Sequence, residues 1–398
     1  MSRVKQNNGM NNNYTKRHYS SAPKNNYRQR GGYVNPSLFV KKVQEVIDAP
    51  KASTEARFDH YLIADIIKQN IATHGYTIPT PIQEQSIPEI LLGRDVIGMA
   101  KTGTGKTAAF LITLINKVYH DPDQKVLIVV PTRELAVQIS DEFRIFARGT
   151  GLYMTSIIGG TSINNQIQNL RRGPNFVVGT PGRLKDLVDR GDLNLDVCQN
   201  VVLDEVDRMV DIGFIHDIKY LISFLPKVRQ SLFFSATVDG KTQEILTSFV
   251  QNPVAITIKS TESAENIDQD VIRLLPGQSK IDVLHDLLIQ PSFQKVIIFG
   301  RTKWRMEKLS MALAERGLRS AIIHGNKSQN YRQRALRAFK NNQQNILIAT
   351  DVASRGLDID NVTHVINFDA PESYEDYIHR IGRTGRAGKR GVALTFVD

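Results

Sequence analysis

A glycine-containing stretch is the first candidate for chemistry, because residues 100–107 read AKTGTGKT. It follows a short apolar run, 96–99, and precedes an amphipathic stretch, so it joins an expected strand to an expected helix. Backbone amides in such a turn bind phosphates, and a lysine there reaches the β and γ phosphates. We therefore predict a P-loop with Lys106 on the phosphates and the Thr107 hydroxyl on magnesium, although Ala100 replaces the usual glycine. The remaining residues of the predicted cradle are Thr102, Gly103, Thr104 and Gly105.

A P-loop needs a carboxylate for its metal at the end of a neighbouring strand. Residues 201–205 read VVLDE, an apolar run that ends in two acids. Asp204 is expected to hold magnesium through its water shell, and Glu205 is placed to polarise the attacking water as a general base. Either acid alone would be interpreted as a solvated strand end. Behind a P-loop, the pair predicts nucleotide hydrolysis.

Three arginines at three-residue spacing occur in the stretch HRIGRTGR, residues 379–386. A cluster of this kind is usually a solvated or phosphate-binding face. Phosphoryl transfer, however, needs a cation for the charge that develops on the γ-phosphoryl group. The spacing puts the guanidinium groups on one side of a helix, and they can reach ATP only if two halves of the chain close on each other.

Parallel sheets covered by helices must position these residues, since short apolar runs alternate with amphipathic stretches from about residue 45. The first series of expected strands is 96–99, 126–130, 155–158, 176–179, 201–204, 232–235 and 254–258, and the second is 271–275, 296–299, 320–323, 346–349, 364–368 and 392–396. The polar stretch 259–268, KSTESAENID, is predicted to be a linker. The two halves are similar in plan, which indicates two copies of one α/β architecture at 45–258 and 269–398.

Charge is concentrated at the N-terminus of this 398-residue chain. Residues 1–42 carry nine of the 51 Lys and Arg and no Asp or Glu, so they supply nine of the eleven net positive charges. Asparagines, glycines and tyrosines are interleaved with the charges, which predicts a disordered basic arm over residues 1–44. This composition suits phosphates and stacked bases, and a solvated leader is the alternative.

Several protein classes are excluded by composition. The chain has one cysteine, Cys198, which forms neither an intramolecular disulfide nor a multi-thiolate zinc site and indicates a reducing compartment. Apolar runs fall short of the ~18 residues of a membrane span, and the N-terminus lacks the apolar core of a secretory signal. We therefore expect a cytoplasmic protein that does not bind membranes.

The ordered series AKTGTGKT, PTRELA, TPGR, DEVD, SAT, ATDVASRGLD and HRIGRTGR resembles that of DEAD-box RNA helicases over about residues 55–398. The resemblance implies two tandem RecA-like domains, with ATP and Mg²⁺ as cofactors. The stretches 213–218 and 323–329 resemble the bacterial RhlE-like branch in particular. The chain departs from the pattern at Val206, which makes the acidic motif DEVD, and it ends at Asp398 without the usual closing helix.

Further site residues are implied by the resemblance. Gln83 would bond the adenine edge with support from Phe58, and Asp358 would approach the ribose. Arg383 and Arg386 would be the arginine fingers, whereas Arg380 would contact the DEVD loop and Asp207, Ser235 and Thr237 would couple the ATP site to RNA. The implied RNA contacts are Pro131, Thr132, Arg133, Gly159, Gly160, Thr180, Pro181, Gly182, Arg183, Arg301, Gln329, Arg332 and Thr350.

The function implied by the resemblance is RNA-stimulated ATP hydrolysis that drives local, non-processive unwinding of RNA duplexes or remodelling of ribonucleoproteins by a monomer. The partners would be single-stranded or duplex RNA. Val206 favours one alternative, an ATP-gated RNA clamp or annealing factor with slow turnover. A DNA translocase is a third interpretation, because it would use the same architecture.

Overall fold

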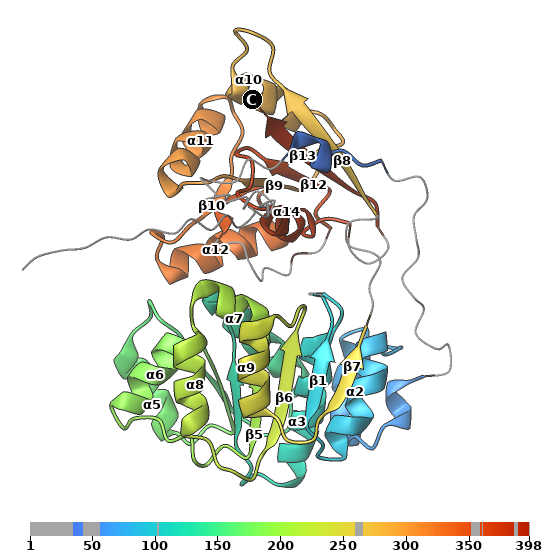
Figure 1. Cartoon of the computed structure of the whole chain (residues 1–398), viewed down its shortest axis with the longest axis vertical. Helices are drawn as coiled ribbons and strands as arrows, with labels where there is room; N and C mark the ends of the chain where they lie inside the picture. Colours follow the sequence, from blue (N-terminus) through green and yellow to red (C-terminus); the bar gives the residue numbers. More distant parts are fainter. Residues whose placement is uncertain are drawn as a thin grey trace, which may run out of the picture.

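Two α/β domains make up this computed structural model, which describes residues 35–42, 56–101, 103–258, 266–351, 359, 361–385 and 389–397 (Figure 1). The predicted site residues Thr102, Asp358 and Arg386 lie outside the described residues, as do residues 1–34 and 259–265.

The first domain alternates strands and helices as its apolar runs predict. Its elements are η2 (Phe58–His60), α1 (Asp65–Thr73), α2 (Pro81–Leu91), β1 (Val96–Met99), α3 (Lys106–His120), β2 (Val126–Val129), α4 (Arg133–Phe146), β3 (Met154–Ile157), α5 (Ile163–Arg171), β4 (Phe176–Gly179), α6 (Pro181–Asp189), β5 (Asn200–Leu203), α7 (Val206–Ile212), α8 (Ile215–Ser223), β6 (Gln230–Ser235), α9 (Gly240–Phe249) and β7 (Val254–Thr257).

The second domain repeats this plan on a smaller scale. Its elements are β8 (Ile267–Arg273), α10 (Lys280–Leu288), β9 (Val296–Phe299), α11 (Lys303–Glu315), β10 (Ala321–Ile323), α12 (Gln329–Lys340), β11 (Ile346–Ala349), β12 (His364–Asn367), α14 (Tyr374–Ile381) and β13 (Gly391–Val397). All expected strands of both series are present, most of them within one or two residues of the expected bounds.

The first sheet has the strand order β3-β4-β2-β5-β6-β1-β7, and every pair in it is parallel. The carboxyl ends of parallel strands lie at one edge of a sheet, so the loops after β1, β5 and β6 emerge side by side. These loops carry the predicted P-loop, the DEVD stretch and the SAT stretch. The strand order therefore brings three separate parts of the sequence to one place.

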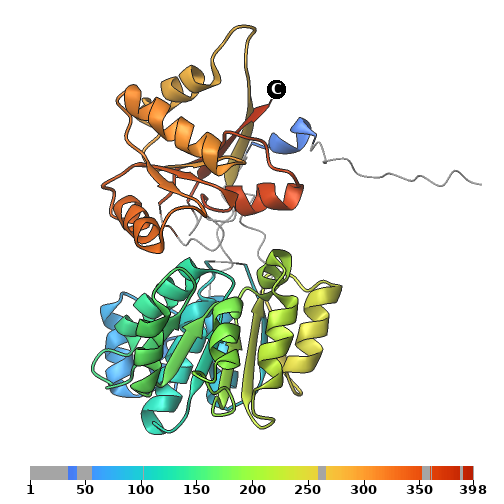
Figure 2. The ribbon, with the colours of Figure 1, turned by 90° about the vertical axis from the view of Figure 1, so that its left-hand side faces the viewer.

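The first sheet is buried on both faces. Along β2, Ile128 belongs to the apolar cluster on one face, whereas Leu127 and Val129 belong to the cluster on the other. Successive side chains of a strand point to opposite faces, so an unbroken apolar run is what a doubly covered strand requires. Helices lie on both sides of the sheet (Figure 2).

The second sheet has the order β10-β11-β9-β12-β13-β8, again with parallel pairs throughout. Its outer strand β8 begins at Ile267, inside the predicted linker and four residues before the expected start at Val271. The sequence hides this start because Asp268 and Gln269 are polar. Both are nevertheless buried, since Arg390 pairs with Asp268 at 2.5 Å and the Tyr377 hydroxyl donates to Gln269 at 3.0 Å.

Residues 35–42, which we call the N-terminal segment, dock on the second domain. They belong to the predicted arm 1–44, yet Pro36–Phe39 form the short helix η1 and Lys41 pairs with Gln269 of β8. Both figures place this segment, in blue, beside the upper domain. Residues 35–42 of the predicted disordered arm therefore have a defined structure, which the basic and polar composition of the arm did not indicate.

Among the described residues, the helices are too short or too polar to cross a membrane.

Candidate active site

The P-loop is shaped by close packing against the start of α2. Gly105 has φ +95°, and a Cβ built on it would lie 2.5 Å from Gln83 Nε2, so only glycine fits here. Gln83 Nε2 donates to the Gly105 carbonyl at 3.0 Å, and Gln83 Oε1 accepts from the Thr80 amide at 2.9 Å. The predicted adenine-reading glutamine therefore braces the P-loop directly.

Lys106 opens helix α3 and is buried, with Nζ donating to the Ala100 carbonyl at 2.5 Å. The ammonium group thus folds back onto the P-loop backbone, at the end of β1. Thr107 is half-buried beside it, Gly103 has φ +81°, and the Thr104 hydroxyl donates to the Lys101 carbonyl at 2.8 Å. The described residues of the predicted cradle form one turn, as expected for a phosphate site.

Phe58, predicted to support the adenine contact, is buried in the core of the first domain with 4% of its surface exposed. Its ring stacks with that of Tyr76 at 6.3 Å and meets Tyr61 edge-on at 6.2 Å. The aromatic group anchors the chain that leads into the glutamine-bearing helix α2. Direct contact of Phe58 with adenine stays a prediction.

Asp204 and Glu205 follow β5 and are buried, with exposed fractions of 2% and 6%. Glu205 has a left-handed backbone, φ 53° and ψ 51°, which is uncommon for a residue with a side chain and marks a strained turn into α7. Burial raises the pKa of Asp204 to about 7, the Lys106 charge opposes the rise, and Glu205 adds to it. A carboxylate in such surroundings is stabilised by a cation beside it.

Arg208 is a site residue that the sequence reasoning missed. Its Nη1 donates to Glu205 Oε2 at 2.8 Å, and both side chains are largely buried. The two residues are three positions apart across the start of α7, where side chains of a helix meet. The three-residue spacing of Glu205 and Arg208 is the sequence signal from which this ion pair could have been predicted. Arg208 fixes the direction of the Glu205 carboxylate.

Asp207, Ser235 and Thr237 form the hydrogen-bonded connection that the family resemblance implies. Asp207 Oδ2 accepts from the Ala236 and Thr237 amides at 3.1 and 2.9 Å and from the Thr237 hydroxyl at 3.2 Å. The Asp207 amide donates to Ser235 Oγ at 3.2 Å, and Ser235 Oγ donates to the Thr237 carbonyl at 2.6 Å. The loops after β5 and β6 are therefore joined rigidly.

A buried contact joins the two domains between helices α4 and α12. Glu134 Oε1 accepts from Gln329 Nε2 at 3.1 Å and pairs with Arg332 Nη2 at 2.9 Å. Gln329 and Arg332 were predicted to contact RNA, whereas Glu134 was missed, although it lies inside the PTRELA stretch next to predicted RNA residues. We call the contact between Glu134, Gln329 and Arg332 the RNA-edge contact.

Arg133 lies against the backbone of Gly159 and Gly160. A Cβ on Gly160, which has φ +79°, would overlap the Arg133 guanidinium, and one on Gly159 would lie 3.0 Å from it. The two predicted RNA glycines thus make room for a predicted RNA arginine. Burial lowers the pKa of Arg332, Glu134 opposes the change, and the Arg133 charge adds to it, so the two arginines lie close across the interface.

The other predicted RNA residues of the first domain lie at helix starts. Thr132 is the N-cap of α4 and accepts from the Leu135 amide at 3.3 Å, and Thr180 is the N-cap of α6. Arg183 donates to the Thr161 carbonyl at 3.4 Å and lies 3.6 Å from Asp186. Pro131 and Pro181 are buried at the same starts. Helix N-termini provide amides that suit phosphates.

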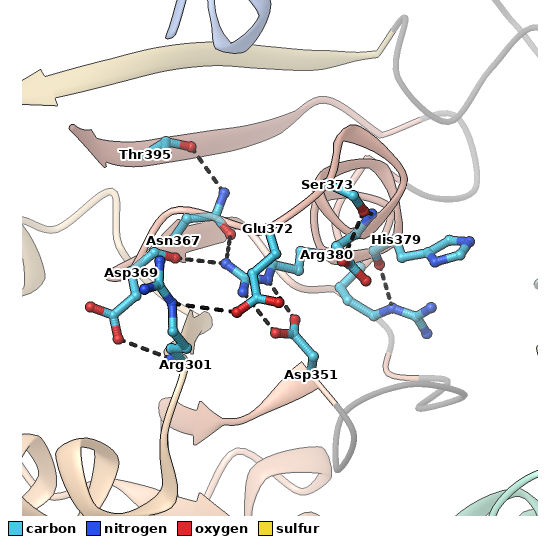
Figure 3. A network of polar contacts seen from close by, with 11 residues as sticks. Arg301, Asp351, Asn367, Asp369, Glu372, Ser373, His379, Arg380 and Thr395 are labelled. Carbon is cyan, nitrogen blue, oxygen red and sulfur yellow. Dashed lines mark hydrogen bonds and ion pairs between the residues drawn. The ribbon is translucent and has the colours of Figure 1, made fainter. Parts of the chain in front are cut away.

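The printed side-chain hydrogen bonds of Arg380 all go to described residues of the second domain, so its contact with the DEVD loop stays a prediction. Its guanidinium binds both carboxylate oxygens of Asp351 at 2.6 and 2.8 Å (Figure 3). It also donates to Asn367 Oδ1 at 3.2 Å and to the Asp369 carbonyl at 2.7 Å. A buried guanidinium needs such partners, and α14 places it next to them, so Arg380 braces the second domain.

The predicted arginine finger Arg383 is buried, and its Nε donates to the His379 carbonyl at 3.2 Å on its own helix end. Arg301, predicted to contact RNA, is half exposed and lies 3.8 Å from Glu372, while its amide donates to Asp369 at 2.9 Å. Thr350 is nearly buried at the end of β11. Arg301 and Thr350 follow β9 and β11, so both lie at the carboxyl edge of the second sheet.

Two family models match the chain. The DEAD/DEAH box helicase model matches residues 80–245, and the helicase conserved C-terminal domain model matches residues 279–388.

Curated relatives match most of the chain. The ATP-dependent RNA helicase CshA of Limosilactobacillus reuteri is 43% identical over 343 residues, which are 86% of this chain and 69% of the relative. The DEAD-box ATP-dependent RNA helicase CshA of Streptococcus pneumoniae is 46% identical over 338 residues, 84% of this chain and 64% of the relative. The chain thus spans about two thirds of the length of these relatives.

Solved structures of similar fold include S. cerevisiae Dbp5 bound to RNA and ADP BeF3, with TM-score 0.75, 32% identity, and coverage of 86% of this chain and 89% of that one. Mss116p bound to ssRNA and AMP-PNP has TM-score 0.78, 32% identity, and coverage of 88% and 76%. A DEAD box protein from Methanococcus jannaschii has TM-score 0.51 at 36% identity, with coverage of 86% and 93%.

Proposed function

Because this chain belongs to the DEAD/DEAH box helicase family and has its two RecA-like domains, we propose that it is an RNA-stimulated ATPase that separates RNA duplexes locally or remodels ribonucleoproteins. ATP and RNA would bind across the two domains and close them. Hydrolysis and phosphate loss would reopen the domains and release RNA, so unwinding would be non-processive.

The RNA-edge contact is the observation that carries this proposal. Glu134 of α4 meets Gln329 and Arg332 of α12, so the predicted RNA residues of the two domains lie at one shared edge. The domains are placed more as in the RNA-bound Dbp5 and Mss116p than as in the M. jannaschii protein, because the TM-scores are higher for the first two although the third has the higher sequence identity. A score over two domains depends on their relative placement.

The residues of the ATP site have separate tasks in this proposal. Lys106 leaves the Ala100 carbonyl to bind the β and γ phosphates, and Glu205, oriented by Arg208, accepts a proton from the attacking water. Arg383 would leave the His379 carbonyl and neutralise charge on the γ-phosphoryl group, together with Arg386. Gln83 reads adenine with the P-loop it braces, and Asp358 approaches the ribose.

Thr107 and Asp204 fit a hydrated Mg²⁺ ion. The observation in favour is the buried Asp204 carboxylate, whose pKa is raised by burial and would fall again beside a cation. When bound with ATP, the metal supplies charge neutralisation on the phosphate oxygens.

The decisive experiment measures phosphate release with no nucleic acid, with single-stranded RNA and with single-stranded DNA of the same sequence. We expect RNA to stimulate hydrolysis strongly and DNA to do so weakly, with Lys106→Ala inactive throughout. Stimulation by DNA alone would support a translocase instead. Binding of RNA in the presence of ATP without stimulated hydrolysis would support the clamp.

Finer assignments are also proposals. The stretches 213–218 and 323–329 support a RhlE-like subgroup with the DEVD variant, although the curated relatives carry the name CshA. We propose that the protein acts as a monomer in the cytoplasm. There a buried thiol such as Cys198, whose pKa burial raises to about 12, would stay reduced and unreactive.

A further inference from the structure

We propose that the N-terminal segment is a docking motif that fastens the basic arm to the outer strand of the second domain and thereby delivers the arm to RNA there. The surface it fits is the β8 edge with the apolar pocket beside it. The docking stands on contacts alone, and only the RNA ligand rests on the function proposed above.

Phe39 is the anchor of the segment, with 1% of its surface exposed. Its ring lies 4.5 Å from that of Tyr377, centroid to centroid. The other buried residues of the pocket are Ile267, Ile381, Ala393 and Val397. The neighbours Leu38 and Val40 are 51% and 48% exposed, so one side chain makes the apolar contact. Burial of an aromatic side chain away from water stabilises the docked segment.

Backbone pairing sets the register of the segment. The Lys41 amide donates to the Gln269 carbonyl at 2.9 Å, and the Gln269 amide donates to the Lys41 carbonyl at 2.7 Å, in antiparallel sense. β8 is an outer strand, and an added segment satisfies its unpaired groups. Lys42 Nζ lies 2.8 Å from Asp270 Oδ2, an exposed pair that adds little energy but agrees with the register.

Because of the order of the chain, docking of the segment determines where residues 1–34 are attached. The segment precedes the first domain in sequence but binds the second, and the chain between Lys42 and Ala56 can span up to ~50 Å. Residues 1–34 are therefore attached at the second domain. Their seven cations are Arg3, Lys5, Lys16, Arg17, Lys24, Arg28 and Arg30.

Fastening raises the concentration of these cations near RNA on the second domain, because a short tether confines a group to a small volume. Each phosphate of single-stranded RNA that they neutralise steepens the log–log salt dependence of binding by about 0.7. Release of the segment would leave the same charges attached through the first domain only, where they are less confined.

The docking is tested in the full chain by Phe39→Ala, with Leu38→Ala as the matched control that removes an exposed side chain of similar kind. We expect hydrogen exchange at the Lys41 and Gln269 amides to accelerate at least tenfold in Phe39→Ala and to stay unchanged in Leu38→Ala. Equal exchange in wild type and Phe39→Ala would overturn the docking motif.

The delivery of the arm is tested by a double-mutant cycle that combines Phe39→Ala with replacement of the seven cations by glutamine. We expect neutralisation to weaken RNA binding several-fold at low salt in the Leu38→Ala background and by less than twofold in the Phe39→Ala background. Equal losses in both backgrounds, or no loss in either, would overturn the proposal. The proposed function is tested by a separate measurement, the RNA-stimulated ATP hydrolysis of the Leu38→Ala variant.

Discussion

The two edges of the interface between the domains differ in what already joins them. At the RNA edge, Glu134 binds Gln329 and Arg332 across the domains. The other edge, which we call the ATP edge, holds the P-loop and the arginines predicted to act near it. There Lys106 binds its own P-loop, Arg383 binds its own helix end and Arg380 binds Asp351 of its own domain. Direct protein contacts can therefore align the RNA edge, whereas the cations at the ATP edge bind partners that phosphates would have to replace.

The largest expected effect comes from breaking the ATP edge at its carboxylate. Glu205→Gln should lower the RNA-stimulated turnover number about 100-fold or more while ATP and RNA remain bound, because Glu205 acts in the chemical step. Lys106→Ala should lose ATP binding as well. Rapid-quench kinetics and nucleotide titration measure the two effects, and parent-rate hydrolysis by Glu205→Gln would refute its role as base.

Breaking the RNA edge should have the next largest effect. Glu134→Ala leaves Arg332 without its carboxylate in the closed placement, a loss that typically costs ~2 kcal/mol or more at an interface. RNA binding with an ATP analogue should weaken about 30-fold. The control is Asp141→Ala in the same helix, whose carboxylate makes an exposed pair with Arg144. Equal RNA affinity in the two variants would show that the contact does not support closure.

A third effect is expected from removing the charged partner of Arg380, a buried cation of the ATP edge. Asp351→Asn removes the charged partner of the buried Arg380, and the free energy of unfolding of the second domain should fall by ~3 kcal/mol. Thermal or urea denaturation measures it. Glu372→Gln, which alters an exposed pair with Arg301 at 3.8 Å, should change stability little. If both variants unfold alike, Arg380 does not brace the domain.

The smallest effect is expected at Val206. The side chain has no exposed surface and belongs to the core cluster below α7, so Val206→Ala leaves a small cavity and should lower stability by ~1 to 2 kcal/mol. Since Asp204, Glu205 and Asp207 keep their places, turnover should change only several-fold. An inactive wild type that Val206→Ala restores to full hydrolysis would favour the clamp.

Much of the fold could be predicted, because parallel strands that are buried on both faces have continuous apolar sequences. The run 296–299 is an example, and β9 has those bounds. The start of β8 was missed, because Asp268 and Gln269 are buried by partners far away in sequence. The N-terminal segment was missed for the same reason, since Phe39 meets Tyr377 only after the whole second domain is folded.

In the candidate ATP site, the positions of Lys106, Asp204 and Glu205 at the ends of neighbouring strands could be predicted from residue types and spacing, because the chemistry requires those types there. Their roles stay predictions, and the residues that support them were not predicted. Arg208 and Glu134 were missed since an arginine or glutamate on a helix is ordinary until its partner is known. The contact of Arg380 with the DEVD loop, which the family resemblance implies, stays a prediction, whereas its bonds to Asp351 were not predicted because an arginine on a helix does not indicate its partner.

The position of Phe39 also has a consequence for synthesis on the ribosome. Its pocket includes Val397 at the far end of β13, so 358 residues must follow Phe39 before the pocket exists. At ordinary elongation rates that delay is roughly 20 to 70 s, during which the first domain can fold ahead of it. Phe39 is thus synthesised long before its pocket, and until the pocket forms its aromatic side chain is exposed to chaperones.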